Sequence, residues 1–431
     1  MTAICGLFLW VIEMVAKTDI KFYVHTNNSA PQLTNNFGCM LNVLDAALIN
    51  GIQVGTVSSL TASDKIVTAV FGTAHNLMQY QVIKIAGANQ AEYNVEARIL
   101  TVPNATTITF ELAALPSVAS ATGTINCSLP SLGWEKPFSS TSVTGGKGAY
   151  RSKNLMLPSR PFLRVVDELD PAYTATYAKF AKVGIVEDMT DIDTMLGVQA
   201  PYDSAAPNKN WVGTGSGTTA INGWAKWYYY FATNGQSESA APTVSQRTWI
   251  LVGTKDYFYI IPAGGNNLIE ALTCGFGAFN SVLNADNFCT FLAATLRNVP
   301  VNNSSGYFAS DNAIGHSSNT ARLLLQRGYG ASQYIAATTR TFTVTNIDLL
   351  SGSANYSASK AVVNKVYLLP VMINETSTII RGELPGIKYL NQQLPYVDLQ
   401  IFTEKNEIFI AKSCLVQGNT NGQIVLKVGD L

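Results

Sequence analysis

The sequence predicts a mainly β protein: a β-sandwich-like body with few helices and an inserted small antiparallel β-module. Short β-prone runs, separated by Gly, Pro, Asn and Ser, recur along the 431 residues. Only residues 35–50 show clear helical spacing of apolar residues. Between 57 and 127 the runs become shorter and more regular than on either side. We therefore expect an apolar N-terminal segment (1–16), a β-rich body (17–56 plus 128–431) and an inserted β-module (57–127).

The N-terminal segment contains the almost wholly apolar stretch AICGLFLWVIEMVA. It is too short to span a bilayer as a helix, and Glu13 interrupts it. It also lacks the basic start and the small-residue cleavage site of a signal peptide. We expect it to be buried against a neighbouring subunit; alternatively, Met14 is the true start. No other run approaches transmembrane length, so no membrane partner is predicted.

The body begins with a strand and a helix. Residues 18–24 (TDIKFYV) alternate apolar and polar side chains, which predicts a strand. In 35–50, residues such as Phe37, Leu41 and Leu44 recur at helical spacing. Asn35 or Asn36 can cap this helix, and the following glycine suits its end.

Five short runs predict the strands of the inserted module. They are separated by turn-forming residues, as in a compact antiparallel unit. The sequence on both sides resembles one body, so the module is predicted to interrupt a hairpin-like connection. The five runs are 65–71, 81–86, 92–100, 106–111 and 123–127.

The remaining chain is predicted to be mostly strands and loops. Residues 139–148 (SSTSVTGGKG) and 299–315 are predicted loops, and 283–296 has room for a short helix. The last run, QIVLKV at 423–428, is predicted to be an edge strand. The other predicted strands are 162–166, 175–185, 225–231, 248–252, 257–261, 339–345, 360–373 and 407–414, with 248–252 and 257–261 forming a hairpin.

The charge composition is unusual. Lys and Arg number 28, Asp and Glu also 28, and charged residues make up only 13% of the chain. A net charge of zero provides no electrostatic attraction for nucleic acid, so no nucleic-acid partner is predicted. Interface cores are poor in charge and rich in aromatic residues, and this chain has 19 Tyr. The composition fits a subunit of a large assembly; a neutral β-rich monomer is the alternative.

No motif predicts catalysis, a cofactor or a metal. His25, His75 and His316 are far apart in the sequence, and GTGSG at 213–217 precedes no apolar helix. The six cysteines form no CxxC pair and are predicted to be buried thiols of a reduced compartment, although an even count also permits disulfides. They are Cys5, Cys39, Cys127, Cys274, Cys289 and Cys414.

The acidic run EDMTDID contains Glu187, Asp188, Asp191 and Asp193. We predict a solvated turn. One alternative is a site for a hard cation, which needs several oxygen ligands brought together. Another is the carboxylate pair of a glycosidase, but neighbours on one loop rarely oppose each other across a substrate.

The aromatic run GWAKWYYYF at 223–231 is predicted to be a strand with side chains on two faces. Trp and Tyr suit contact surfaces because each combines an apolar body with a polar tip. Trp224, Trp227, Tyr228 and Tyr230 are therefore a candidate interaction surface for a sugar ring or a neighbouring subunit. The alternative is core packing on both faces.

Residues 61–127 resemble a small β-module that recurs in virion proteins of tailed bacteriophages. The matching motifs are TAHNL, QVIKIAG, AEYN and ATTITFEL. The surrounding stretches FYVHTNNSAPQL, GWEKPFS, RPFLRVVDELD, EDMTDIDT, TWILVGTKDYFYII, GFGAFNS and RGELPGIKY are similar to phage neck, tail or baseplate accessory proteins.

This resemblance implies a virion structural protein of the neck or collar, tail or baseplate, assembled in the host cytoplasm. Its partners would be copies of itself and other phage structural proteins, held by multivalent contacts. The resemblance provides no catalytic residues. Alternatives are a receptor- or glycan-binding tail fibre or spike with a host surface glycan as partner, and a capsid decoration protein. A depolymerase acting through Asp188 or Asp191 is a more distant alternative.

Overall fold

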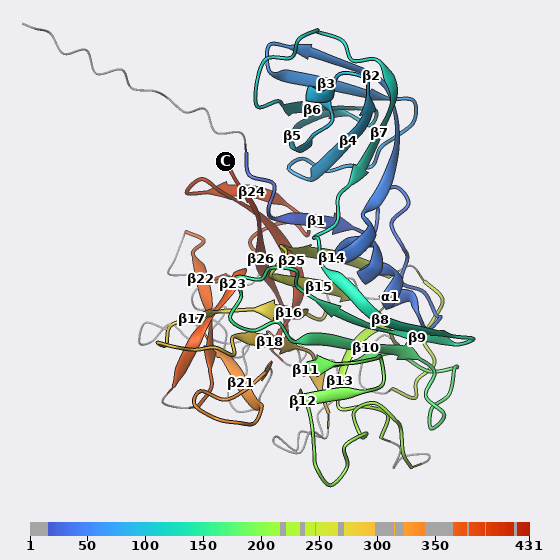
Figure 1. Cartoon of the computed structure of the whole chain (residues 1–431), viewed down its shortest axis with the longest axis vertical. Helices are drawn as coiled ribbons and strands as arrows, with labels where there is room; N and C mark the ends of the chain where they lie inside the picture. The colour runs from blue at the N-terminus through green and yellow to red at the C-terminus, as the bar shows by residue number, and fades with distance from the viewer. Residues whose placement is uncertain are drawn as a thin grey trace, which may run out of the picture.

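The computed structural model describes residues 16–215, 221–232, 238–245, 247–265, 271–297, 314, 323–340, 365–376, 379–392, 394–417 and 420–431. These residues are mainly strands, as predicted, with one α-helix among them. Figure 1 shows a barrel at one end of the molecule and two larger sheets that form the body below it. Residues 1–15, and most of the predicted loop 299–315, lie outside the described residues.

The inserted module is a closed six-stranded barrel. Its interior is filled by side chains such as Val67, Ile99 and Phe110, each fully buried, so the barrel has a packed core. The barrel spans 52–129, slightly more than the predicted 57–127, because its long first strand was not among the predicted strands. In spatial order the strands are β2 (Ile52–Ser63), β3 (Ile66–Phe71), β6 (Thr107–Glu111), β5 (Glu96–Asn104), β4 (Val82–Ala88) and β7 (Gly123–Leu129), with the 3-10 helix η2 (Ala91–Tyr93) after β4.

Two of the barrel strands belong to both of its halves. The first residues of β2 pair with β7, and its later residues pair with β3 after a register shift. In the same way β5 pairs first with β4 and then with β6. Such irregularities bend strands and close small barrels. We call β2-β7-β4-β5 the proximal half and β2-β3-β6-β5 the distal half.

The first sheet of the body has seven strands among the described residues. It is antiparallel and joins segments from 135 to 296. Its order is β19 (Thr295–Leu296), β13 (Ala225–Tyr230), β11 (Lys179–Met189), β10 (Phe162–Glu168), β9 (Gly145–Arg151) and β8 (Glu135–Ser142), with β12 (Met195–Ala200) also paired to β11.

The second sheet has thirteen strands among the described residues and curls around a core of its own. Its order is β1 (Lys21–Val24), β14 (Thr248–Gly253), β15 (Tyr257–Ala263), β16 (Cys274–Ala278), β18 (Thr290–Ala293), β20 (Leu323–Leu325), β21 (Ile335–Arg340), β22 (Leu368–Asn374), β23 (Ile380–Leu390), β26 (Thr420–Asp430), β25 (Glu407–Gln417) and β24 (Ile401–Glu404), with β17 (Asn280–Ser281) paired to β23.

Strands β14 and β15 form a central layer with both faces buried. Leu251 and Phe258 belong to the core shared with the seven-stranded sheet. Their neighbours Ile250 and Tyr259 belong to the core shared with the C-terminal strands. The body is therefore a three-layer sandwich. Continuous apolar runs such as WILV suit strands that have no solvent face.

The helix begins at Cys39 and ends near Asn50, as α1 (Cys39–Leu44) followed by the π-helix η1 (Asp45–Asn50). Its N-cap is Gly38, whose φ of 88° suits glycine and which offers no side chain. The predicted caps Asn35 and Asn36 are therefore wrong. The Asp167 carboxylate on β10 accepts the N–H of Met40 at 2.9 Å and caps the helix from 127 residues away.

Three further predictions are corrected by the structure. Residues predicted as the loop 139–148 form most of the β8–β9 hairpin, because β10 provides the pairing partner that fixes them. The segment 283–296 contains strands β18 and β19 instead of a helix. The strand β26 lies between β23 and β25, and β24 is the edge instead. The predicted hairpin of β14 and β15 is confirmed.

Candidate interaction site at the junction of barrel and body

Two buried amide side chains join the barrel to the body. Asn27 follows β1, and Gln81 precedes β4; they are 3% and 0% exposed. The Asn27 Nδ2 donates to Gln81 Oε1 at 3.1 Å, and Gln81 Nε2 donates to Asn27 Oδ1 at 3.0 Å. Gln81 Nε2 also donates to the Phe22 carbonyl of β1 at 3.1 Å. Since buried polar groups are costly to leave unpaired, this reciprocal pair fixes the junction.

Arg98 on β5 is a second attachment point, and its side chain is only 3% exposed. Its guanidinium donates to the carbonyls of Lys17 at 2.6 and 3.1 Å and of Val428 at 2.7 Å. It also donates to Tyr80 at 2.7 Å and to Ile20 at 3.2 Å. One barrel residue thus connects the first and last described segments of the body. Burial lowers the pKa of Arg98 to about 10, which leaves it charged at neutral pH.

A cleft of about 620 Å³ opens beside this junction. The proximal half of the barrel forms one wall, and the linker that follows β7, with the end of η1, forms the other. This volume lies within the usual range for ligand sites, about 300–1,000 Å³. The lining residues are Lys21, Asn50, Gly51, Gln53, Lys84, Ala86, Glu96, Asn126, Ser128, Leu129, Pro130, Ser131, Leu132 and Gly133.

Four polar side chains form a row across the barrel wall of the cleft. Gln53 pairs with Ser128, Ser128 with Lys84, and Lys84 with Glu96, each on a neighbouring strand. Directly paired residues point to the same side of a sheet. We call these four residues the polar row. It places an amide, a hydroxyl, an ammonium and a carboxylate side by side.

The charges of the polar row are only partly compensated. Lys21 on β1 forms an ion pair with Glu96 at 3.2 Å and donates to the Ser131 carbonyl at 3.1 Å. The Lys84 ammonium makes no hydrogen bond or ion pair with any described residue, and the side chains of Gln53 and Ser128 likewise make none. The cleft can therefore bind polar or anionic groups through hydrogen bonds.

The aromatic run is packed in the core and is not a surface. Trp224, Trp227, Tyr228 and Tyr230 are 4, 0, 0 and 2% exposed. The Trp227 ring packs edge to face on the Phe258 ring, with 6.0 Å between the ring centroids. The predicted interaction surface is therefore wrong, and packing on both faces is correct. β13 lies between β11 and β19, with the central layer against one face and the loop containing Glu238 against the other.

Tyr230 lines a hollow of about 540 Å³. Its hydroxyl donates to the Thr243 carbonyl at 3.1 Å, and the Arg247 guanidinium lies 4.2 Å from its ring centroid. With the ring covered and its hydroxyl bonded, little of Tyr230 can stack on a ligand. The other lining residues are Gln32, Leu33, Thr34, Asn35, Asn36, Val244 and Ser245.

Only part of the acidic run is a turn: Glu187 and Asp188 belong to β11, and Glu187 forms an ion pair with Arg327 at 2.6 Å. Asp191 Oδ1 accepts the N–H groups of Asp193 and Thr194. Asp193 accepts from Arg164 at 2.6 Å and from Lys147 at 2.9 Å. Glu187, Asp191 and Asp193 thus each have separate partners and do not converge on one point. Among the described residues no group of three or more His, Cys, Asp or Glu could hold a metal ion.

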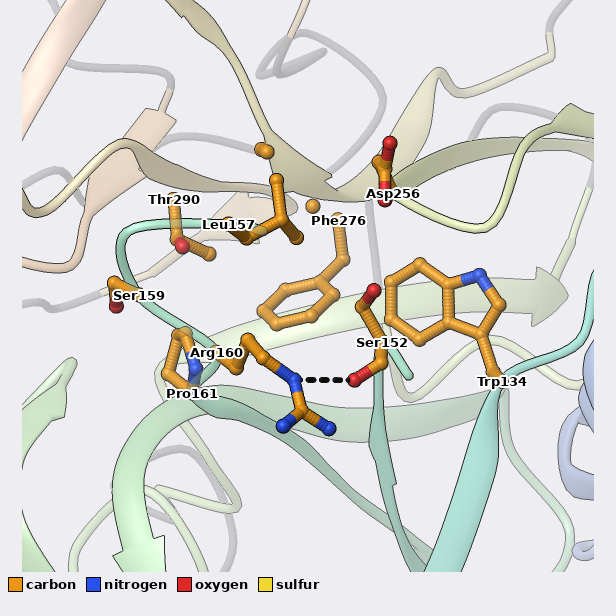
Figure 2. Close-up of a pocket in the computed structure, with 11 residues that line it drawn as sticks. Trp134, Ser152, Leu157, Ser159, Arg160, Pro161, Asp256, Phe276 and Thr290 are labelled. Atoms are coloured by element: carbon orange, nitrogen blue, oxygen red, sulfur yellow. Dashed lines mark hydrogen bonds between the residues drawn. The ribbon is translucent and has the colours of Figure 1, made fainter. Parts of the chain in front are cut away.

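Figure 2 shows a small interior pocket beneath the loop that follows β9. Trp134 and Phe276 form part of its wall, and Arg160 Nε donates to the Ser152 carbonyl at 2.8 Å. The space amounts to about 10 Å³, which is room for one water molecule. It is too small for a substrate.

The remaining histidines and cysteines form no cluster of metal-ligand size among the described residues. His25 and His75 lie in separate places, and burial lowers the pKa of both, which favours neutral rings. His316 and Cys5 lie outside the described residues. The other five cysteines are buried free thiols, as predicted. No helix in the described ranges is long and apolar enough to cross a membrane.

Sequence reasoning missed Asn27, Gln81 and Arg98, the residues that build the junction. Arg98 stands between the barrel-core residues Ala97 and Ile99, as any outward residue of a strand would. Its partners Lys17 and Val428 are 81 and 330 residues away. No local pattern in the sequence marks such contacts.

Comparisons with known proteins find little. No family model matches the chain, and no curated protein matches it. Among solved structures, the chain is similar to one described as "Phage phi92 endosialidase", with 11% sequence identity and a TM-score of 0.18. The match covers 82% of this chain and 59% of that chain. A TM-score this low is below that of chains sharing a fold, so the likeness identifies neither fold nor function.

Proposed function

We propose that this chain is a structural component of a tailed bacteriophage particle, located in the neck or collar, tail or baseplate. It would act through multivalent contacts with copies of itself and with other phage structural proteins. The observation that carries the proposal is the closed barrel inserted between η1 and β8 of the body, because its sequence resembles a module recurrent in virion proteins.

The junction and the composition support the same role. Arg98 and the Asn27–Gln81 pair make the barrel a fixed projection of the body, so its position would follow from that of the body. Repeated subunits bury surface against one another in symmetric assemblies. A chain with 13% charged residues has few charges to desolvate in such contacts.

Purified particles test the proposal. Mass spectrometry of particles banded on a density gradient should detect this polypeptide at a fixed ratio to the major capsid protein. Immunogold electron microscopy should then place it on the neck, tail or baseplate; labelling of the capsid would favour a decoration protein instead. Absence of the polypeptide from washed, infectious particles would contradict the virion role.

A receptor- or glycan-binding role is the second candidate, and the cleft is the observation that favours it. Its polar row offers unpartnered amide, hydroxyl and ammonium groups to a saccharide. Binding of host-surface polysaccharide by the purified chain should weaken in Lys84→Ala. It should persist in Lys153→Ala, which removes an exposed lysine outside the cleft. No binding at high saccharide concentration, or equal binding by both variants, would count against this role.

The proposal assigns no reaction to the chain. Incubation with host polysaccharide should release no reducing ends above the buffer level. Hydrolysis that disappears in Asp188→Asn or Asp191→Asn would instead support a depolymerase.

A further inference from the structure

The distal half of the barrel presents a row of hydroxyl side chains. Thr61, Thr68, Thr109 and Thr101 are paired in register across β2, β3, β6 and β5. Each alternates with barrel-core residues and points outward. Ser120 extends the row through an isolated bridge to Thr61. All five side chains are exposed or half-buried, and the row crosses every strand of this half.

The rows on either side continue the same chemistry. One contains Ser59, Val70 and Thr107 at paired or neighbouring positions. The other contains Ser63, Ile66 and Glu111. We call these three rows the hydroxyl face. Its one charged side chain, Glu111, lies at a corner, and the charged turn residues Asp64 and Lys65 lie beyond the rows.

The two halves of the barrel differ in character. The polar row of the proximal half includes Lys84 and Glu96, whereas the centre of the hydroxyl face carries no charge. Depletion of charge is the compositional mark of interface cores. Strands β2, β3 and β6 lie at the end of the barrel away from the two body sheets (Figure 1), and among the described residues the side chains of the hydroxyl face stay exposed or half-buried.

The hydroxyl face is also stiff. Thr, Val and Ile have strongly restricted χ1 angles, so little side-chain freedom remains to be lost on contact. The Oγ1 atoms of Thr101 and Thr109 lie 2.7 Å apart in a hydrogen bond that already orders part of the row. A surface ordered in this way loses less entropy when it binds.

We propose that the hydroxyl face binds the hydroxyl face of a second copy of this chain. Each hydroxyl can both donate and accept a hydrogen bond. The hydroxyls of one copy can therefore bond to the same hydroxyls of a second copy related by a two-fold axis. A face of donors alone, or one of a single charge sign, would repel its own copy. The β-branched methyl groups between the hydroxyls add apolar contact area.

The size of the face sets the strength of the contact. Four strands spaced about 4.8 Å apart and three rows about 6.8 Å apart cover about 400 Å² per copy. A pair of faces therefore buries about 800 Å², which is less than the roughly 1,000 Å² of a stable interface. The isolated pair should be weak, and it gains strength where other contacts hold two copies close together.

Cross-linking tests the contact on the purified full chain. Thr68 lies on an inner strand of the distal half. In the Thr68→Cys variant, a short bismaleimide reagent should therefore link the introduced thiols of two chains. Thr124→Cys, an exposed threonine position on β7 of the proximal half, is the matched control. We expect the cross-linked dimer to form at least about ten times faster in Thr68→Cys than in Thr124→Cys. Adding Thr109→Glu to Thr68→Cys should reduce the rate to that of Thr124→Cys.

Sedimentation analysis at increasing protein concentration provides the second measurement. The unmodified chain should show weak reversible association that Thr68→Glu abolishes and Thr124→Glu leaves intact. Equal cross-linking of the two cysteine variants, or no association at the highest soluble concentration, would overturn the inference. Both measurements use the purified protein alone, so their outcome is independent of the particle experiment. The chain can lack self-association and still be found in particles, or self-associate and be absent from them.

Discussion

Asp167 lies where the helix meets the seven-stranded sheet, and it is fully buried. Its carboxylate accepts the Met40 N–H at 2.9 Å and the Tyr229 hydroxyl at 2.8 Å. Burial raises the pKa of Asp167 to about 6, although these hydrogen bonds and those from Gly38 and Leu41 oppose the rise. One residue thus connects the helix, β10 and β13.

The raised pKa predicts a specific dependence of stability on pH. The pKa of about 6 in the folded state exceeds the ordinary value of 3.8 for an aspartic acid, so the folded state binds this proton more tightly. The stabilisation is complete below about pH 4 and is lost as the pH rises through 6, at most about 3 kcal/mol. Denaturant unfolding of the native chain and of Asp167→Asn should therefore show a difference that shifts in favour of the variant between pH 4 and pH 7.

A second acidic substitution provides the control. Asp203→Asn changes a partly exposed loop residue and should leave the pH dependence as in the native chain. Parallel unfolding curves for the native chain and Asp167→Asn across this pH range would contradict the assignment.

At the scale of elements, strands with two buried faces differ from strands with one. In β14 every residue from Trp249 to Gly253 is buried, because the seven-stranded sheet covers one face and the C-terminal strands cover the other. In β3 of the barrel, buried residues alternate with exposed or half-exposed residues. The two patterns predict different sensitivity to substitution.

Alanine substitutions should reveal this difference. Ile250→Ala and Leu251→Ala should each lower the free energy of unfolding by about 2–4 kcal/mol, since each leaves a cavity in a packed core. In β3, Val67→Ala should be costly, whereas Thr68→Ala should change stability by less than about 0.5 kcal/mol. Urea unfolding measures all four. An Ile250→Ala variant with the same free energy of unfolding as the native chain would show that the second face of β14 is not packed.

These elements also show how far a sequence can be interpreted. The β14–β15 hairpin was predictable because two apolar runs flank a short turn. The β8–β9 hairpin was not, since its Ser, Thr and Gly residues acquire a strand structure only from pairing with β10. The apolar run in 283–296 suits a helix or a buried strand equally, and only the neighbouring strands decide.

At the scale of the whole molecule, the barrel and the body are held together by a few long-range contacts. Gln81 and Arg98 were invisible in the sequence because their partners come from both ends of the body. Gly429 next to Arg98 shows how close this packing is: a Cβ there would lie 2.5 Å from the Arg98 Cζ. The candidate cleft depends on the same contacts, so it too could be found only in the folded structure.

Removal of the guanidinium should loosen the barrel. Arg98→Met leaves buried carbonyls unpaired and should cost about 2–4 kcal/mol of unfolding free energy. Small-angle X-ray scattering should show a larger radius of gyration, and hydrogen exchange should increase in β1 and at the end of β26. Arg151→Met, which removes an ion pair with Glu135 within one sheet, should leave the radius unchanged. An Arg98→Met chain with the native radius of gyration would show that the Asn27–Gln81 pair is enough to hold the barrel in place.

The two ends of the barrel meet at one place, where Ile52 at the start of β2 pairs directly with Leu129 at the end of β7. Paired Cα atoms in antiparallel strands are about 5 Å apart. Excision of 52–129 therefore leaves a gap that a short turn can bridge, and a different domain with neighbouring termini can occupy the same position. The barrel is therefore replaceable as a unit: exchange of the chain between two neighbouring junctions, one before Ile52 and one after Leu129, leaves the strand order of the body unchanged.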